Sequence, residues 1–89
     1  MKLFNELDFK AHSVWEGGKQ ARISFENGYG ASVISGGGSY TSDENPYELA
    51  VLYDGAITYN TGITSDVIGN LNAKGVNTLL GKIKNLQSN

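Results

Sequence analysis

Short runs of alternating apolar and polar residues flank two matching turn signals, Glu26-Asn27-Gly28 and Tyr53-Asp54-Gly55. A Gly-rich stretch, 35–46, lies between them. Asparagine or aspartate followed by glycine tolerates positive φ, and between alternating runs this pair is typical of a β-hairpin. The pattern therefore predicts two hairpins joined by a glycine-rich connection.

The register of the first hairpin follows from its hydrophobic pattern. A three-residue loop puts Phe25 opposite Tyr29 and collects the apolar residues of both strands on one face, with Arg22 on the other. A slip of one residue would move every side chain to the opposite face, so the clean segregation favours this register. The loop then needs a left-handed residue at its end, which is the place for Gly28.

The same logic applied to the second hairpin predicts a three-residue loop of residues 53–55. That loop aligns Val51 with Ile57 and Leu49 with Tyr59. The apolar side chains of these strands again share one face.

The remaining elements are read from the period of the pattern. Strands are expected over 9–16, 20–26, 29–35, 47–53 and 56–61. After Gly62 the apolar period lengthens to that of a helix, which predicts a short helical turn over 66–70 and a longer helix over 73–86. Asn72 is the expected N-cap of the longer helix.

These elements predict an α+β fold, an antiparallel β-meander of four to five strands covered on one face by a C-terminal α-helix. The 89 residues form a single domain, 1–89, with the sheet over 9–61 and a helical segment over 64–87. So small a chain buries a modest core and contains no cysteine to form a disulfide. A homo-oligomer, most simply a dimer, is therefore expected.

Seven basic and nine acidic residues give a net charge of −2, and Arg22 is the only arginine. Duplex-binding proteins concentrate lysine and arginine on one face, so duplex nucleic acid is not an expected partner. No apolar run approaches the roughly 20 residues of a membrane span. The N-terminus turns polar at Asn5, too early for a signal peptide, so the expected location is the cytoplasm, away from membranes.

Few residues offer catalytic or metal-binding chemistry. His12 is the one histidine, and with no cysteine present it would need a matching serine and acid for nucleophilic catalysis. The carboxylates Asp43, Glu44 and Glu48 lack the spacing of a calcium loop, and no zinc set, P-loop or dinucleotide fingerprint occurs. A non-enzymatic protein without cofactor or metal is expected.

The loop between the hairpins is the leading candidate for ligand binding. Consecutive glycines let several backbone N–H groups point at one anion, and nearby hydroxyl groups add donors. Arg22 or Lys19 would supply the positive charge, and Tyr40 or Trp15 a stacking surface. The candidate ligand-binding residues are Gly36, Gly37, Gly38, Ser39, Tyr40, Thr41, Arg22, Lys19 and Trp15. The alternative is that the loop only connects the hairpins and Arg22 is a solvated charge.

Four segments, 27–34, 47–52, 57–59 and 63–71, together resemble a family of small proteins of phages and prophages that has no assigned function. The resemblance implies a phage accessory protein that acts on host machinery or host defence by binding. With the candidate loop it leads to one hypothesis, a non-enzymatic counter-defence protein that sequesters a small anionic ligand such as a nucleotide immune signal. The alternative is a protein-binding inhibitor of a host defence enzyme.

Overall fold

An antiparallel sheet and one helix make up the fold. The computed structural model describes residues 2–11, 18–36, 46–58 and 68–86. The strands are β1 (Lys10–Ala11), β2 (Lys19–Ser24), β3 (Tyr29–Ser35), β4 (Tyr47–Tyr53), β5 (Ala56–Ile57) and β6 (Ile68–Leu71). They pair in the order β1-β2-β3-β4-β5, and β6 also pairs with β4. The helix α1 (Ala73–Lys84) completes the predicted α+β class.

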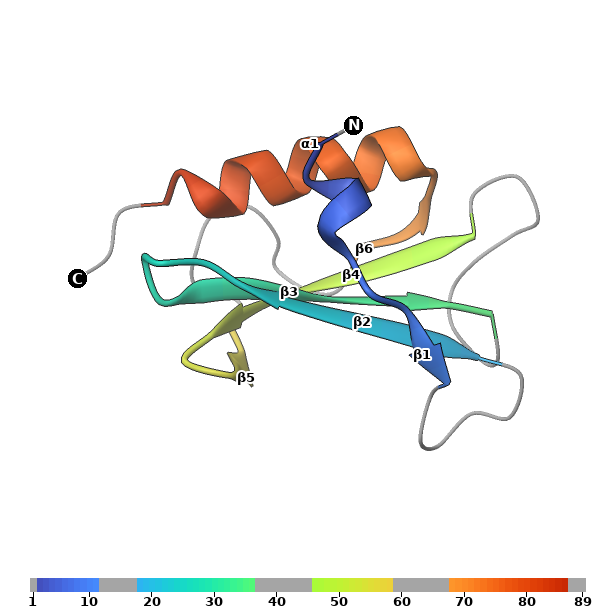
Figure 1. Ribbon diagram of the computed structural model, residues 1–89, viewed down its shortest axis with the longest axis horizontal. Helices are drawn as coiled ribbons and strands as arrows, with labels where there is room; N and C mark the ends of the chain where they lie inside the picture. Colours follow the sequence, from blue (N-terminus) through green and yellow to red (C-terminus); the bar gives the residue numbers. More distant parts are fainter. Residues whose placement is uncertain (1, 12–17, 37–45, 59–67, 87–89) are drawn as a thin grey trace.

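The helix α1 lies along one face of the sheet (Figure 1). Asn72 caps its N-terminus, because its side-chain oxygen accepts a hydrogen bond of 2.8 Å from the backbone N–H of Gly75. The core between helix and sheet consists of Ala31, Val33, Leu49, Val51, Val76, Leu80 and Ile83. The meander covered by a C-terminal helix is confirmed.

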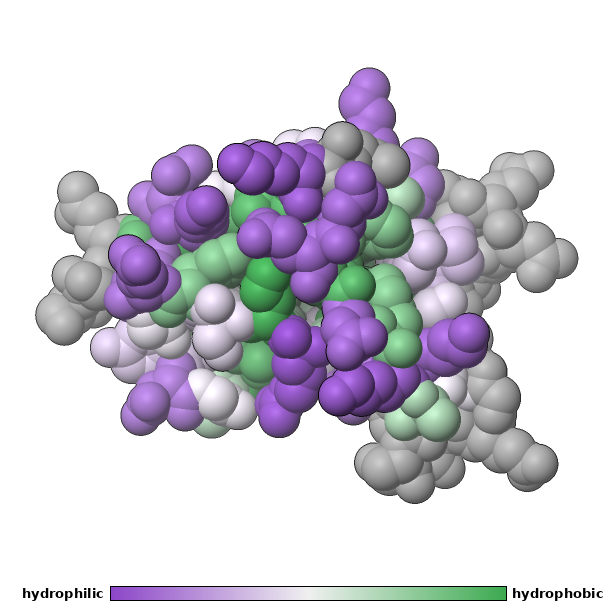
Figure 2. Space-filling view, viewed as in Figure 1, coloured by the Kyte–Doolittle hydropathy of each residue, from purple (hydrophilic) through white to green (hydrophobic). Residues whose placement is uncertain are grey.

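The N-terminal segment closes one side of this core. The short 3-10 helix η1 (Phe4–Glu6) contacts α1, where the backbone N–H of Phe4 donates to Asn77 Oδ1 at 2.9 Å. The Phe4 and Phe9 rings lie 5.3 and 5.7 Å from the ring of Tyr47. Figure 2 shows hydrophobic residues as a broken seam between the helix and the sheet, with hydrophilic residues on either side.

The first hairpin has the predicted register. Ala21 pairs with Val33 and Ile23 with Ala31, and the backbone N–H of Phe25 donates to the carbonyl oxygen of Tyr29. The loop is closed by Gly28, whose φ is +88°.

In the second hairpin the predicted register is wrong by one residue. Leu52 pairs with Ile57 and Tyr53 with Ala56, so the loop has two residues and Ile57 does not align with Val51. The physical reason is that Asp54 and Gly55 both have positive φ, +51° and +84°. This combination makes the tight turn whose twist matches the strands that it joins. As a result Ile57 lies on the face away from α1 and is 53% exposed.

The predicted helical turn over 66–70 is also corrected, because Ile68–Leu71 is the strand β6. It pairs along the part of β4 that the short β5 does not cover, Leu49 with Ile68 and Tyr47 with Leu71. Two β4 residues here therefore gain a partner strand that the local sequence did not indicate. The predicted partner of Leu49, Tyr59, lies outside the described residues, as do 12–16 of the first predicted strand and 59–61 of the last.

Candidate functional site

The sheet face opposite α1 carries the polar residues of the first hairpin. Because side chains alternate along a strand, Gln20 and Arg22 of β2 share this face with Ser32 of β3. Arg22 pairs with Ser32, which pairs in turn with Ala50 of β4. The face therefore places one cationic side chain beside a row of small ones, and the sequence had predicted that Arg22 points away from the core.

Two hydrogen bonds orient the side chains of this face. The Gln20 amide donates to the hydroxyl oxygen of Ser32 at 2.8 Å. Arg22 Nη2 donates to the carbonyl oxygen of Gly55 at 3.3 Å, in the turn of the second hairpin. In Figure 1 this hairpin turns below the sheet on the side away from α1. A guanidinium carries further donors in a rigid fork, and because Arg22 is exposed these are accessible to solvent.

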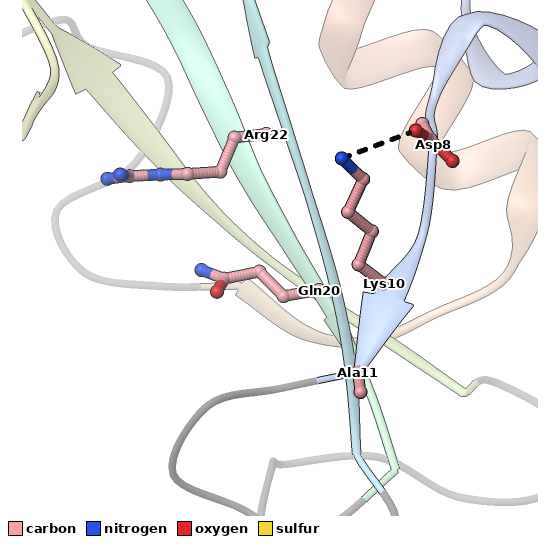
Figure 3. Close-up of a pocket in the computed structure, with 5 residues that line it drawn as sticks. All are labelled: Asp8, Lys10, Ala11, Gln20 and Arg22. Carbon is pink, nitrogen blue, oxygen red and sulfur yellow. Dashed lines mark ion pairs between the residues drawn. The ribbon is translucent and has the colours of Figure 1, made fainter.

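One cavity lies where β1 leaves the edge of β2. It has a volume of about 320 Å³ and is lined by Asp8, Lys10, Ala11, Gln20 and Arg22. Figure 3 shows Gln20 and Arg22 extending from the same side of β2, with Lys10 rising from the neighbouring β1. Lys10 Nζ lies 3.8 Å from Asp8 Oδ2, but both side chains are about 80% exposed, 78% and 82%, so this ion pair binds loosely. The cavity presents two cationic groups against one carboxylate.

A second cavity of about 210 Å³ adjoins the first and shares Gln20 and Arg22 with it. Its remaining lining consists of Ser32, Ile34, Glu48, Ala50, Leu52 and Ile57. Ser32 and Glu48 are buried polar groups, whereas Ile57 is exposed. Arg22 therefore stands between a cationic cavity and one with an apolar floor and a few polar groups, a combination typical of small-ligand sites.

Of the predicted ligand-binding residues, the structure describes Arg22, Lys19 and Gly36. Lys19 and Arg22 are separated by an odd number of positions along β2. Because side chains alternate along a strand, they project from opposite faces of the sheet. Lys19 is exposed and pairs with Ser35, next to Gly36, whose φ of +73° is left-handed. The other predicted residues, Trp15 and 37–41, lie outside the described residues, as do His12, Asp43 and Glu44.

Lys10 and Gln20 line the first cavity but are not among the ligand-binding residues predicted from the sequence. For Gln20 the signal was present, because alternation from Arg22 places it on the same polar face. Lys10 had no such signal, since its place beside the cavity depends on the pairing of β1 with β2.

Two other features are absent from the described ranges. No cluster of three or more histidine, cysteine or carboxylate side chains there is arranged to hold a metal ion. Within the same ranges, no helix has the length and apolar character that crossing a membrane requires.

No protein-family model matches the sequence, and neither the curated proteins nor the solved structures include a match to it.

Proposed function

We propose that the protein binds a small anionic ligand, such as a nucleotide, at Arg22 and releases it chemically unchanged. The observation that carries this proposal is the position of Arg22 between two adjoining cavities, one cationic and one with an apolar floor. A guanidinium pairs with phosphate through two parallel hydrogen bonds, which gives both affinity and orientation.

The two cavities suit the two parts of a nucleotide. A phosphate beside β1 would meet Arg22 and Lys10, and Gln20 would stand at the boundary between the cavities. A base on the sheet face would lie over apolar side chains such as Ile34 and Ile57. The Gly-rich loop, which follows Gly36 at the end of β3, is proposed to add backbone donors.

Sequestration needs affinity without a catalytic group. The two cavities offer cationic, amide, hydroxyl and aliphatic side chains for binding, together with one carboxylate each, Asp8 and Glu48. With the resemblance to phage and prophage proteins, the proposal is a counter-defence protein of the host cytoplasm that removes a nucleotide immune signal from its receptor. A homo-oligomer that completes the cavities from two chains belongs to the same proposal.

The first test is a panel of cyclic and linear nucleotides added to the purified protein. We expect one class to raise the melting temperature and to be recovered intact after the complex is heated, because a ligand that binds only the folded state stabilises it. A ligand recovered in altered form would mean that the protein is an enzyme. If no nucleotide shifts the melting temperature, the proposal is wrong.

The second test compares Arg22→Gln with Lys82→Gln. Both variants remove one exposed positive charge, but Lys82 lies in the last turn of α1 and lines neither cavity. Losing a charged hydrogen-bond donor costs about 1.5–3 kcal/mol, so Arg22→Gln should weaken binding by about tenfold to more than a hundredfold. Lys82→Gln should bind like the wild type. If both variants bind the ligand equally weakly, Arg22 contributes only through the overall charge of the protein and is not a specific binding residue.

The alternative function, a protein-binding inhibitor of a host enzyme, is favoured by the outer edge of β2. Among the described residues β1 pairs only with Lys19 and Gln20. The hydrogen bond from Phe25 to Tyr29 fixes which amides of β2 face β3, so those of Arg22 and Ser24 face outward. A partner strand added here would gain main-chain hydrogen bonds.

Ser24→Pro separates the two functions. Proline removes one outward N–H and is tolerated on an edge strand, so it should block strand addition and leave nucleotide binding near the wild-type level. Arg22→Gln should have the opposite pattern. Loss of a stable host-protein complex in Ser24→Pro, with no nucleotide bound by the wild type, would establish the inhibitor instead.

A further inference from the structure

The side chain of Asn27 holds the C-terminal end of α1 from the loop of the first hairpin. Its Nδ2 donates to the carbonyl oxygens of Ile83, Lys84 and Leu86 at 3.0, 3.1 and 2.8 Å. The last carbonyl groups of a helix have no partner within the helix and need one from outside. The amide nitrogen carries two hydrogens and faces three acceptor oxygens, so one hydrogen is shared between two of these oxygens.

Asn27 is also chemically labile, because Gly28 follows it in the only Asn-Gly pair of the sequence. Glycine has no Cβ to shield its backbone nitrogen. That nitrogen can attack the side-chain carbonyl carbon, Cγ, of the preceding asparagine and close a five-membered ring. In a flexible peptide this reaction is rapid for Asn-Gly.

The fold restrains both reacting groups. Besides the three bonds to the helix end, Asn27 Oδ1 accepts a hydrogen bond of 2.9 Å from the backbone N–H of Tyr29. The attacking nitrogen of Gly28 donates its own hydrogen to the carbonyl oxygen of Phe25 at 3.1 Å. Ring closure needs the Gly28 nitrogen to lose that proton and the Asn27 carboxamide to turn away from the helix.

We propose that Asn27 is a deamidation site which the folded protein suppresses, and which reacts when the contact between the hairpin loop and the helix end opens. The Gly28 nitrogen bonds to Asn27 Cγ and loses its proton. The Cγ–Nδ2 bond then breaks, and Nδ2 takes up a proton and leaves as ammonia. Water then opens the ring at one of its two carbonyl carbons and gives aspartate or isoaspartate. The step is a hydrolysis and involves no oxidant or reductant.

The product no longer holds the helix. An ionised aspartate has no hydrogen to donate, and it places a negative charge against the carbonyl oxygens of Ile83, Lys84 and Leu86. The carbonyls of Ile83 and Lys84 belong to the negative end of the helix dipole. Isoaspartate also lengthens the backbone of a three-residue loop whose register places the core residues of β2 and β3. Deamidation is therefore a one-way change that removes the contact of Asn27 with the end of α1, while the core between the helix and the sheet remains.

The rate is tested on the wild-type protein. Folded protein, protein in urea, and a short peptide containing residues 24–31 are incubated in the same buffer. Deamidation at Asn27 is followed by peptide mass mapping and by release of ammonia. We expect the folded protein to react at least about tenfold more slowly than the other two samples, because opening of the contact must precede reaction. Equal rates in the folded protein and the peptide would overturn the proposal.

The consequence is tested with Asn27→Asp against Asn85→Asp. Both variants add one negative charge at the same end of α1, but Asn85 is exposed and its side chain makes no hydrogen bond within the described part of the chain. We expect Asn27→Asp to unfold at clearly lower urea concentration and Asn85→Asp to stay close to the wild type. Equal shifts of the urea midpoint in the two variants would mean that the added charge destabilises the protein and that the contact of Asn27 with the helix end does not contribute. If Asn27→Asp fails to fold, the rate comparison still decides the proposal.

Discussion

Replacing Gly81 by alanine should stabilise the protein, because Gly81 lies inside α1. Glycine in a helix interior is about 1 kcal/mol less favourable than alanine, since its backbone loses more freedom on folding. A Cβ built on Gly81 would lie 3.9 Å from Leu3 Cδ1, an ordinary van der Waals distance, so nothing has to move. We expect the free energy of unfolding to rise by about 1 kcal/mol and the melting temperature by about 4–8 °C.

The matched comparison is Gly75→Ala in the same helix. A Cβ on Gly75 would lie 3.3 Å from Leu71 Cδ2 and 3.4 Å from Asn72 Oδ1. That oxygen caps the helix, so making room for the new methyl group would disturb the N-cap. The gain in helix propensity is the same as at Gly81, but the disturbed N-cap offsets part of it. We therefore expect a clearly smaller rise in the free energy of unfolding.

The assay is urea unfolding followed by the circular dichroism of the helix, at equal protein concentrations. The midpoint should rise for Gly81→Ala while the slope stays constant, which indicates a change in stability without a change in the surface exposed. A lower midpoint for Gly81→Ala would refute the reasoning. So would equal gains in the two variants, because the packing around each glycine would then have no influence.

Gly30→Ala should lower the free energy of unfolding by about 1–3 kcal/mol in the same assay, because a Cβ there would overlap the backbone carbonyl oxygen of Ile23. A gain in stability would contradict the register between β2 and β3. Leu80→Ala should cost about 2–5 kcal/mol and Leu79→Ala much less, since Leu80 is fully buried and Leu79 only half-buried. Equal losses would contradict the orientation of α1. Light scattering at micromolar concentration should detect a species heavier than the 9.5 kDa chain, and a monomer alone would disprove the homo-oligomer.

The sequence by itself determined the elements whose signals are local. The first hairpin follows from alternation and from the one loop position that needs a left-handed glycine, Gly28. The helix α1 follows from its apolar period and from Asn72, which can cap it without help from distant residues. The orientation of Arg22 follows from the same alternation. These features depend on neighbours within a few residues, so the sequence pattern contains them.

Tertiary structure decided the rest. The second hairpin carries a similar turn pair, Asp54-Gly55 in place of Asn27-Gly28. Asp54 has positive φ, however, and Leu52 pairs with Ile57, which shifts the register by one residue. The strand β6 forms because β4 has an edge that the short β5 leaves uncovered.

Asn27 shows the same division within one residue. Its place beside Gly28 predicted a turn, but its bonds to the end of α1 join residues more than fifty positions apart. The cavities at Arg22 likewise depend on the pairing of β1 with the edge of β2 and on the turn of the second hairpin, which bonds to Arg22. Such contacts form only after the chain has folded, because the partners that satisfy these polar groups are distant in the sequence.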